Sequence, residues 1–585
     1  MKKYLPIILI LILAALLRLV ALDKFPAGLN ADEAAIGYNA WSLIQTGKDE
    51  HGASWPLVFR SFDDYKPPIY FYLVLPFVKL FGLNIWSVRL PSALLGIASV
   101  FLVYLIAKQL FQTVIASGAR QSSISSSILN SQHSIFNCPT ISALILATSP
   151  WHLQFSRGGW EVNAALFFIL LGIYGFLRGL EKPMYLFLFV ISLAISLYTY
   201  HSARLISPLL ALSLVILYWK QLFPERLIKS NSQHSTFNFQ PRIKVILSAV
   251  ILGLLMSLPL AAQLLSKEGQ SRFTGVSVFA DSGPLWQALE MRREHGDLNL
   301  YVKAIHNQYL SYGLRFVKNY LSHFSPRFLF VTGDEIARSK VPGMGQSYLL
   351  LFPFLFLGLL SLLKLDSKGK KFILFWFLIA PVAAALTFQS PHALRAQNMV
   401  IPLSFIFALG LLSFFDILSV FKNLFVKIVI GIVLAFFSIY SVGQYLHQYY
   451  VHYSKELAFA WQYGFDQIAA YSKENYDKYD KIIISDRYDQ PYILMAFFLQ
   501  YPPQTLQKEL VMTPRDRFGF STVRKFGKFE FRSVNYNEDK KLPNTLIISA
   551  DESVDDKAII HTIEDPNGNI MFKLIATTPS LRGTK

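Results

Sequence analysis

The chain has 585 residues, of which 53% are hydrophobic and only 16% are charged, and its formal net charge is +18. Soluble domains carry about a quarter charged residues, so this composition excludes an ordinary soluble protein. The apolar residues also gather in long runs, several of which approach or exceed the roughly 18–20 residues that span a bilayer. The sequence therefore predicts a polytopic α-helical membrane protein.

The excess positive charge first suggests nucleic acid, but its placement points to the membrane. Lys and Arg cluster in short loops between apolar runs, within residues 2–3, 220–244 and 364–371. This is the pattern of cytoplasmic loops in multi-pass proteins. We therefore expect a multi-pass protein of the plasma membrane and no nucleic-acid partner. The first run, 4–22, contains Arg18 and no small-residue cleavage site, so we interpret it as a retained span.

The apolar runs predict about 11 transmembrane helices together with interfacial helices. The aromatic run 68–82 is short for a span and contains Pro76 and Lys79, which suits a helix that lies along the membrane surface. If this helix is not counted as a transmembrane span and the N-terminus is cytoplasmic, every basic loop lies on the inner side of the membrane. The expected spans are 4–22, 88–110, 138–155, 161–179, 183–200, 204–220, 243–264, 347–364, 372–388, 397–417 and 423–446.

The same topology gathers the conspicuous polar residues on the outer face of the membrane. The inner loops carry little beyond basic residues, so we expect an active site on the extracytoplasmic side. The outer segments are the first outer loop 23–87, the turns 151–159 and 198–204, the long loop 265–346, and the loop 390–395.

The composition changes after about residue 448. Residues 453–471 have the pattern of a helix, and D-P-N-G-N at 565–569 is a strong turn signal. We therefore expect a transmembrane catalytic domain over 1–447 and a small extracytoplasmic α/β domain over 448–585. The predicted strands are 481–486, 528–534, 545–550 and 571–576.

Two adjacent acids stand where the first outer loop begins a helix, in N-A-D-E-A-A-I-G-Y-N-A. Asn30 is a good N-cap, and Glu33 occupies the capping-box position three residues later. Capping and the helix dipole account well for an acid at Glu33. They account less well for Asp32, which lies one position earlier and roughly 100° away around the helix. Both acids are catalytic candidates, and Asp32 is the one that helix capping does not explain.

A second polar cluster, S-F-D-D-Y-K-P-P-I-Y, enters the expected interfacial helix. A solvated turn would explain the acids alone, but an amine held at headgroup level is a natural partner for phosphate, which makes Lys66 a candidate donor contact. Candidate acceptor or substrate contacts in this segment are Asp63, Asp64 and Tyr65.

Basic residues recur at the outer ends of spans. A single one is usually a snorkelling anchor, but several on one face, near acids, can hold an anionic headgroup. Candidate phosphate contacts are Arg89, Arg204 and His201, and candidate substrate contacts are Arg157 and Arg395. A sugar on a lipid phosphate already carries its leaving group, so its transfer needs a carboxylate for the acceptor hydroxyl and cations for the departing phosphate.

The ordered motifs resemble those of the GT-C glycosyltransferases, in the branch that contains protein O-mannosyltransferases and the lipid A aminoarabinose transferase. The resemblance covers roughly residues 1–420 and leaves the C-terminal domain unmatched. Its motifs are L-L-R-L at the end of the first span, N-A-D-E-A-A-I-G-Y-N-A, D-Y-K-P-P-I-Y, S-V-R-L-P-S-A-L, H-L-Q-F-S-R, Y-H-S-A-R-L and N-Y-L-S-H-F-S-P-R-F-L-F.

The resemblance implies an inverting transferase that uses polyprenyl-phosphate sugars, often without a strict metal requirement. It places the catalytic acid on Asp32 and the donor phosphate at Lys66-Pro67, with Arg89 and Arg204 as less secure matches. We therefore expect transfer of a hexose or pentose to a protein, lipid or glycan acceptor, with the bilayer as a further partner and no required cofactor.

Two alternatives stay open at this point. The first is a transferase with a diphosphate-linked oligosaccharide donor and a divalent metal held by the acids of the outer loop. The second is a lipid-linked-sugar flippase or transporter, which would place charges near the membrane midplane rather than at the ends of spans.

Overall fold

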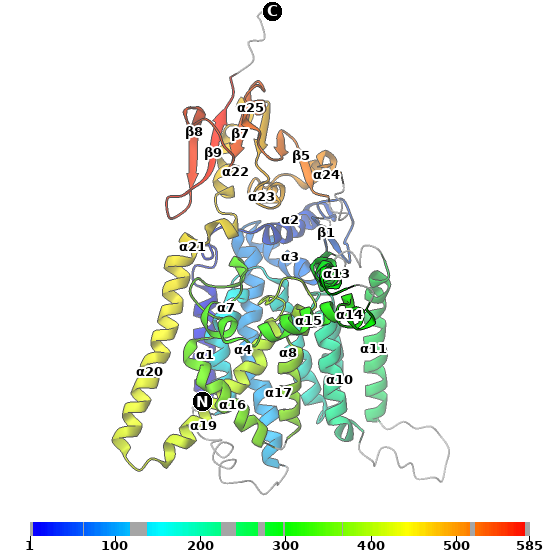
Figure 1. The fold of residues 1–585 in the computed structure, drawn as a ribbon, viewed down its shortest axis with the longest axis vertical. Helices are drawn as coiled ribbons and strands as arrows, with labels where there is room; N and C mark the ends of the chain where they lie inside the picture. Colours follow the sequence, from blue (N-terminus) through cyan, green and yellow to red (C-terminus); the bar gives the residue numbers. More distant parts are fainter. Residues whose placement is uncertain are drawn as a thin grey trace, which may run out of the picture. The chain divides into compact units, whose positions relative to one another are not determined.

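The computed structural model describes residues 4–62, 64–116, 137–223, 241–266, 275–296, 299–365, 367–514 and 521–578 (Figure 1). The chain divides into two compact units. The helical unit comprises residues 1–18, 94–156 and 161–445, and the mixed unit comprises 19–93, 157–160 and 446–585. The first outer loop and the C-terminal residues, which the sequence assigned to different domains, thus belong to one compact unit.

Six helices are long and apolar enough to cross a membrane, within the described ranges. They are Ile85–Phe111, Glu161–Gly179, Ala203–Leu222, Pro241–Leu264, Gln397–Val420 and Leu424–Glu456. Shorter apolar helices cover Leu5–Leu19, Ile69–Phe81, Cys138–Thr148, Tyr185–Leu197 and Leu349–Lys364. These helices support a multi-pass membrane protein, and the number of spans stays a prediction.

The helical unit is built from closely packed helix pairs. α8 (Glu161–Gly179) packs on α9 (Tyr185–Leu197), and α16 (Phe352–Lys364) packs on α19 (Val400–Val420). The other helices of this part of the chain are α1 (Leu5–Leu19), α4 (Ile85–Ala116), α6 (Cys138–Thr148), α7 (Pro150–Ser156), α10 (Ala203–Leu222), α11 (Pro241–Leu264), α13 (Gly283–His295), α14 (Leu300–Ile305), α15 (Gln308–Ser322), α17 (Lys368–Ile379), α18 (Val382–Ala385) and α20 (Leu424–His447).

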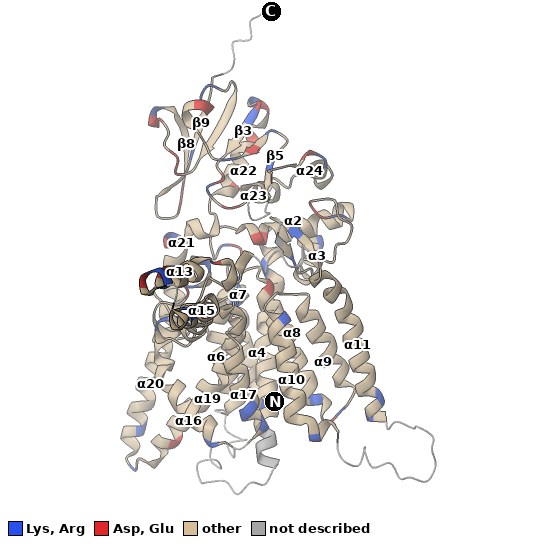
Figure 2. Cartoon of the chain, turned by 45° about the vertical axis from the view of Figure 1, so that its right-hand side comes forward, with Lys and Arg blue, Asp and Glu red and all other residues tan. Residues whose placement is uncertain are grey.

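Basic residues gather at one end of the helical unit. Lys220 lies in the last turn of α10, Lys364 lies in the last turn of α16, and Lys368 begins α17. Figure 2 shows Lys and Arg at this end of α10, α11, α17 and α20. The described ends of the loops 220–244 and 364–371, which the sequence assigned to the inner side, therefore lie at the same end of the helical unit.

The predicted span 138–155 is wrong as a single helix. α6 ends at Thr148, and α7 begins at Pro150 after Ser149, whose φ of −59° and ψ of 122° leave the helical region. The physical reason is the proline, because its ring disfavours the α conformation of the preceding residue.

Close packing of α16 on α19 depends on two glycines. A Cβ on Gly358 would lie 1.9 Å from the Ile406 carbonyl oxygen, and a Cβ on Gly410 would lie 2.0 Å from that of Phe354. Small residues at such crossings let helix backbones approach within a bilayer, where packing replaces the hydrophobic effect as the driving force.

Gly410→Val is therefore expected to lower the stability of the protein in detergent, by about 1–3 kcal/mol or more, because the backbone of α16 occupies the space. The measurement is the thermal unfolding midpoint. Gly431→Val in α20 is the matched control, because a Cβ there meets nothing within 4 Å. Equal midpoints for the two variants would show that α16 and α19 are not packed this closely.

The mixed unit contains a seven-stranded sheet with the order β4-β5-β6-β3-β7-β9-β8. β3 is parallel to both β6 and β7, and the remaining pairs are antiparallel. The central β3 is the run K-I-I-I, and its three isoleucines are fully buried, as expected for a strand covered on both faces. The strands are β3 (Lys481–Ile484), β4 (Val511–Met512), β5 (Val523–Phe526), β6 (Phe529–Phe531), β7 (Thr545–Ser549), β8 (Ile559–Glu564) and β9 (Ile570–Ala576).

The four predicted strands correspond to β3, β6, β7 and β9, and the predicted turn 565–569 joins β8 to β9. The continuous helix predicted over 453–471 is wrong. It is broken into α21 (Tyr453–Glu456), a short turn, and α22 (Phe465–Glu474). The break occurs because Gln462 (φ 52°) and Gly464 (φ 95°) adopt the left-handed conformation, which ends a helix.

The first outer loop forms the other half of the mixed unit. α2 (Ala31–Thr46) packs on α3 (Ile69–Phe81) and on α23 (Pro491–Phe498). Its N-terminus carries the predicted capping box between Asn30 and Glu33. Between α2 and α3, β1 (Phe59–Ser61) and β2 (Asp64–Lys66) form a hairpin.

Candidate functional site

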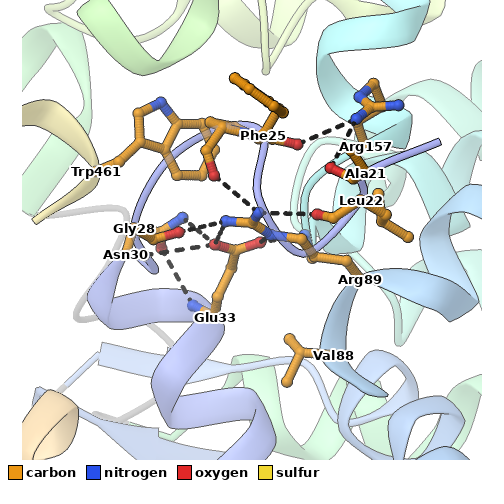
Figure 3. A network of polar contacts seen from close by, with 12 residues as sticks. Ala21, Leu22, Phe25, Gly28, Asn30, Glu33, Val88, Arg89, Arg157 and Trp461 are labelled. Carbon is orange, nitrogen blue, oxygen red and sulfur yellow. Dashed lines mark hydrogen bonds and ion pairs between the residues drawn. The ribbon is translucent and has the colours of Figure 1, made fainter. Parts of the chain in front are cut away.

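Glu33 is a buried acid at the start of α2. Its side chain is fully buried and forms a two-pronged ion pair with Arg89, with distances of 2.9 Å from Nε to Oε1 and 3.0 Å from Nη2 to Oε2 (Figure 3). The Gly159 amide donates to Oε1 at 2.7 Å, and the Asn30 side chain donates to Oε2 at 3.2 Å. Glu33 thus joins three segments of the mixed unit.

Arg89 uses its remaining guanidinium protons on backbone carbonyl oxygens. Nη1 donates to Leu22 and Pro26 at 3.1 and 3.0 Å, and Nη2 donates to Gly28 at 2.7 Å. The guanidinium also lies 5.5 Å from the ring centroid of Trp461. All five donors of Arg89 are therefore engaged within the unit, which favours a structural role over the predicted contact with a donor phosphate.

Arg157 has a similar environment. Its Nη2 donates to the Val20 carbonyl at 2.9 Å, with Ala21 and Phe25 both at 3.3 Å, and its Nε donates to the Tyr449 hydroxyl at 3.1 Å. Figure 3 shows Arg157 and Arg89 on the same backbone turn, residues 21–28. Arg157 therefore holds this turn, and the substrate contact that the sequence suggested for it is not needed to explain its burial.

Asp32 and Lys66, which the sequence placed in the same outer loop as candidate base and candidate phosphate contact, lie side by side. The Lys66 ammonium forms an ion pair with Oδ1 of Asp32, and it lies 4.9 Å from the ring centroid of Phe62. The Asp32 side chain is 35% exposed, whereas that of Lys66 is only 6% exposed. An accessible carboxylate beside a nearly buried ammonium can accept a proton while the cation holds an anion.

Glu50 is a buried acid near this pair that sequence reasoning missed. Its Oε1 accepts from the Asn39 side chain at 3.2 Å, and its Oε2 accepts from the Tyr492 hydroxyl at 3.4 Å. Burial raises the pKa of Glu50 to about 8, although Asn39 and the charge of Lys66 act in the opposite direction. Most of Glu50 is therefore protonated at pH 7. The only signal in the sequence was an acid pair, Asp49-Glu50, after a glycine turn.

The remaining residues of the D-D-Y-K segment form the hairpin. Asp63 lies outside the described residues, Asp64 begins β2, and Tyr65 is half-buried opposite Arg60. Within the described ranges, no group of three or more His, Cys, Asp or Glu side chains could hold a metal ion.

The helical unit contains a cavity of about 340 Å³ that collects three of the predicted basic residues. His201, Arg204 and Arg395 line it together with apolar side chains such as Leu205 and Leu386. Arg395 donates from Nη1 to the Thr387 hydroxyl at 2.7 Å, and Arg204 donates from Nε to the Leu197 carbonyl at 3.3 Å. A cavity of this composition suits a ligand with an anionic group and an apolar part.

Asp334 of the long loop, which the sequence did not single out, fixes the loop that bears Arg395. Its Oδ2 accepts from the Ala393 amide at 2.6 Å and lies 3.7 Å from Nδ1 of His392. Burial raises the pKa of Asp334 to about 6. His323 accepts the His392 amide on Nε2 at 3.1 Å, and burial lowers the pKa of His323 to about 4, so its ring stays neutral.

Comparison with known proteins adds sequence and fold relatives. The model of the family described as dolichyl-phosphate-mannose-protein mannosyltransferase, PMT_2, matches residues 65–130. The YycA protein of Bacillus subtilis (strain 168), provisionally named a mannosyltransferase, is 30% identical over 117 residues, which are 20% of this chain and 14% of that protein.

Two solved structures are similar over most of the chain. ArnT from Cupriavidus metallidurans, solved with bound undecaprenyl phosphate, has a TM-score of 0.51 at 12% identity and 99% coverage of both chains. The archaeal oligosaccharyltransferase AglB from Archaeoglobus fulgidus, in complex with an inhibitory peptide and a dolichol-phosphate, has a TM-score of 0.46 at 13% identity and 85% coverage of this chain.

The chain spans 63% of the length of AglB and 14% of that of YycA. The ArnT-like fold, in contrast, extends over nearly the whole chain. The family model and YycA are both described as mannosyltransferases, so the two sequence comparisons agree in the kind of enzyme that they indicate. The predicted resemblance is thereby confirmed in two respects: residues 65–130 match the PMT_2 family model, and the fold is similar to that of ArnT.

Proposed function

We propose that this protein is an inverting glycosyltransferase that moves one monosaccharide from a polyprenyl-phosphate donor to an acceptor on the extracytoplasmic side of the plasma membrane. The observation that carries the proposal is the ion pair between Asp32, at the first turn of α2, and Lys66, at the end of β2. Lys66 lies within the segment that matches the mannosyltransferase family model.

The chemistry divides between these two side chains. Asp32 takes the proton from the acceptor hydroxyl while the hydroxyl oxygen attacks C1 of the sugar. The bond from C1 to the phosphate oxygen breaks, its electron pair leaves with the polyprenyl phosphate, and the Lys66 ammonium stabilises the added negative charge. A bound donor phosphate replaces Asp32 as the partner of Lys66, which releases the carboxylate to act as a base.

The cavity of the helical unit supports a lipid-phosphate ligand independently. It combines His201, Arg204 and Arg395 with an apolar lining, which fits an anionic head and an isoprenoid tail. ArnT, which shares the fold, was solved with undecaprenyl phosphate. We propose His201 and Arg204 as phosphate contacts within this cavity, and we propose Arg395, Asp63, Asp64 and Tyr65 as acceptor or substrate contacts.

The decisive experiment supplies purified protein in liposomes with a panel of radiolabelled polyprenyl-phosphate sugars and host membranes. We expect label from one of the donors to appear in protein, lipid or glycan. Transfer that occurs only from a diphosphate-linked oligosaccharide and is lost with a chelator would replace the proposal with the metal-dependent alternative. Movement of intact donor across the bilayer without transfer would replace it with a flippase.

Lys66→Met is expected to lower kcat/KM for the donor about 10- to 100-fold, because a charge-assisted hydrogen bond contributes roughly 1.5–3 kcal/mol. The measurement is initial rate against donor concentration. Lys79→Met is the matched control, because Lys79 is an exposed lysine in the last turn of α3. If both variants kept the wild-type kcat/KM, Lys66 would not bind the donor.

A further inference from the structure

The N-terminus of α2 receives a partner from a distant part of the chain. The first N–H groups of a helix have no acceptor within the helix. Here the Glu33 amide donates to Oδ1 of Asn30 at 3.1 Å, as in an ordinary N-cap. The Ala31 amide, one residue before Asp32, instead donates to Oε1 of Gln462 at 2.6 Å, across 431 positions of sequence.

Gln462 is held rigidly enough to serve as a fixed point. Gln462 is only 6% exposed, and its side-chain Nε2 donates to the carbonyl oxygen of Asp489. Its backbone is left-handed, with φ 52° and ψ 45°, and its amide donates to the Phe459 carbonyl at 3.1 Å. The side chain is thus anchored at both of its polar atoms.

The neighbour of Gln462 fixes the segment that leads into α2. The Trp461 ring faces the guanidinium of Arg89, which itself binds Glu33. Gly28 has a φ of 88°, and a Cβ there would lie 2.4 Å from the Trp461 carbonyl oxygen. The turn 461–462 therefore contacts the approach to α2 at Gly28 and its first residue at Ala31.

We propose that Gln462 is a positioning residue for Asp32, so that the C-terminal part of the chain completes the catalytic centre rather than forming a separate accessory domain. The inference rests on the proposed function, in which Asp32 is the base. By holding the Ala31 amide, Gln462 sets the first turn of α2 and hence the position of the Asp32 carboxylate relative to the acceptor hydroxyl. A displacement of about 1 Å in such a group can cost about 100-fold in rate.

Gln462→Asn and Gln462→Met test the proposal in the full-length protein. Asparagine tolerates the left-handed backbone, so it preserves the turn while shortening the reach to Ala31 by one methylene. Methionine keeps the length and removes both polar atoms. We expect kcat to fall about 10- to 100-fold in both variants. The KM for the donor should stay within about twofold, because Lys66 is untouched.

Gln467→Met is the matched control, since Gln467 is an exposed glutamine in α22 of the same segment, and it should keep the wild-type kcat. The proposal is overturned if both Gln462 variants keep kcat within about twofold of wild type while Asp32→Asn is inactive, or if kcat falls only in proportion to the loss of folded protein. An active Asp32→Asn variant would instead overturn the proposed function itself, so the two failures are distinguishable.

Discussion

Asp32→Asn is expected to abolish sugar transfer while leaving the protein folded and able to bind the donor. Asparagine has nearly the same shape but cannot take a proton, and loss of a general base costs about 10²–10⁴-fold in rate. The Asp32 side chain is 35% exposed, and the Oδ1 atom of asparagine can still accept a hydrogen bond from the Lys66 ammonium, so we expect the fold to be kept. The measurement is single-turnover transfer in liposomes, with donor binding measured separately.

The matched control for this variant is Asp466→Asn. Asp466 also stands in the first turn of a helix of the mixed unit, α22, and it is exposed. It should keep the wild-type rate. Near-normal turnover of the Asp32→Asn variant would falsify the mechanism, because no carboxylate would then be required at this position.

The sequence was most informative where the cause is local. The spacing of Asn30 and Glu33 predicted the capping box, and β-branched runs such as K-I-I-I predicted buried strands, because both depend on neighbours within a few residues. The capping-box spacing also distinguished Glu33, which has a capping role, from Asp32, which has none. The sequence placed Asp32 and Lys66 in the same outer loop, and the structure adds the contact between their side chains.

The sequence failed where the cause is distant. The ion pair of Arg89 with Glu33 joins residues 56 positions apart, and the contact of Gln462 with Ala31 joins residues 431 positions apart. The periodicity of apolar residues along the sequence carries no information on either of these two long-range contacts. The helix predicted over 453–471 was wrong for the same reason. Tertiary contacts hold Gln462 in the left-handed conformation, which a sequence-based prediction expects only at glycine.

The structure also gives different environments to two basic residues that looked equivalent in the sequence. Arg89 and Lys66 were both candidate phosphate contacts, but the donors of Arg89 are consumed by Glu33 and three carbonyl oxygens. Lys66 instead faces a partly exposed carboxylate, which an incoming phosphate can replace. Whether a cation has all its hydrogen-bond donors engaged, as Arg89 does, or can exchange its partner, as Lys66 can, depends on side-chain packing. A single sequence does not reveal this packing.

Glu33→Leu is expected to produce the largest loss of stability in the mixed unit. Both Glu33 and Arg89 have fully buried side chains, so removing the carboxylate leaves an uncompensated cation in a low-dielectric interior. Breaking a buried pair in this way costs about 3–5 kcal/mol, which is a large fraction of the stability of most domains. The measurement is the yield of monodisperse protein and its unfolding midpoint in detergent.

The double variant Glu33→Leu with Arg89→Met separates a structural pair from a catalytic one. If the pair is structural, the double variant is expected to be more stable than either single variant, since no isolated charge remains buried. Arg60→Met, on the neighbouring hairpin, is the control for loss of an arginine that is only half-buried. A Glu33→Gln variant that unfolds at the wild-type temperature but transfers no sugar would contradict the structural role, because Glu33 would then act on the substrate together with Asp32.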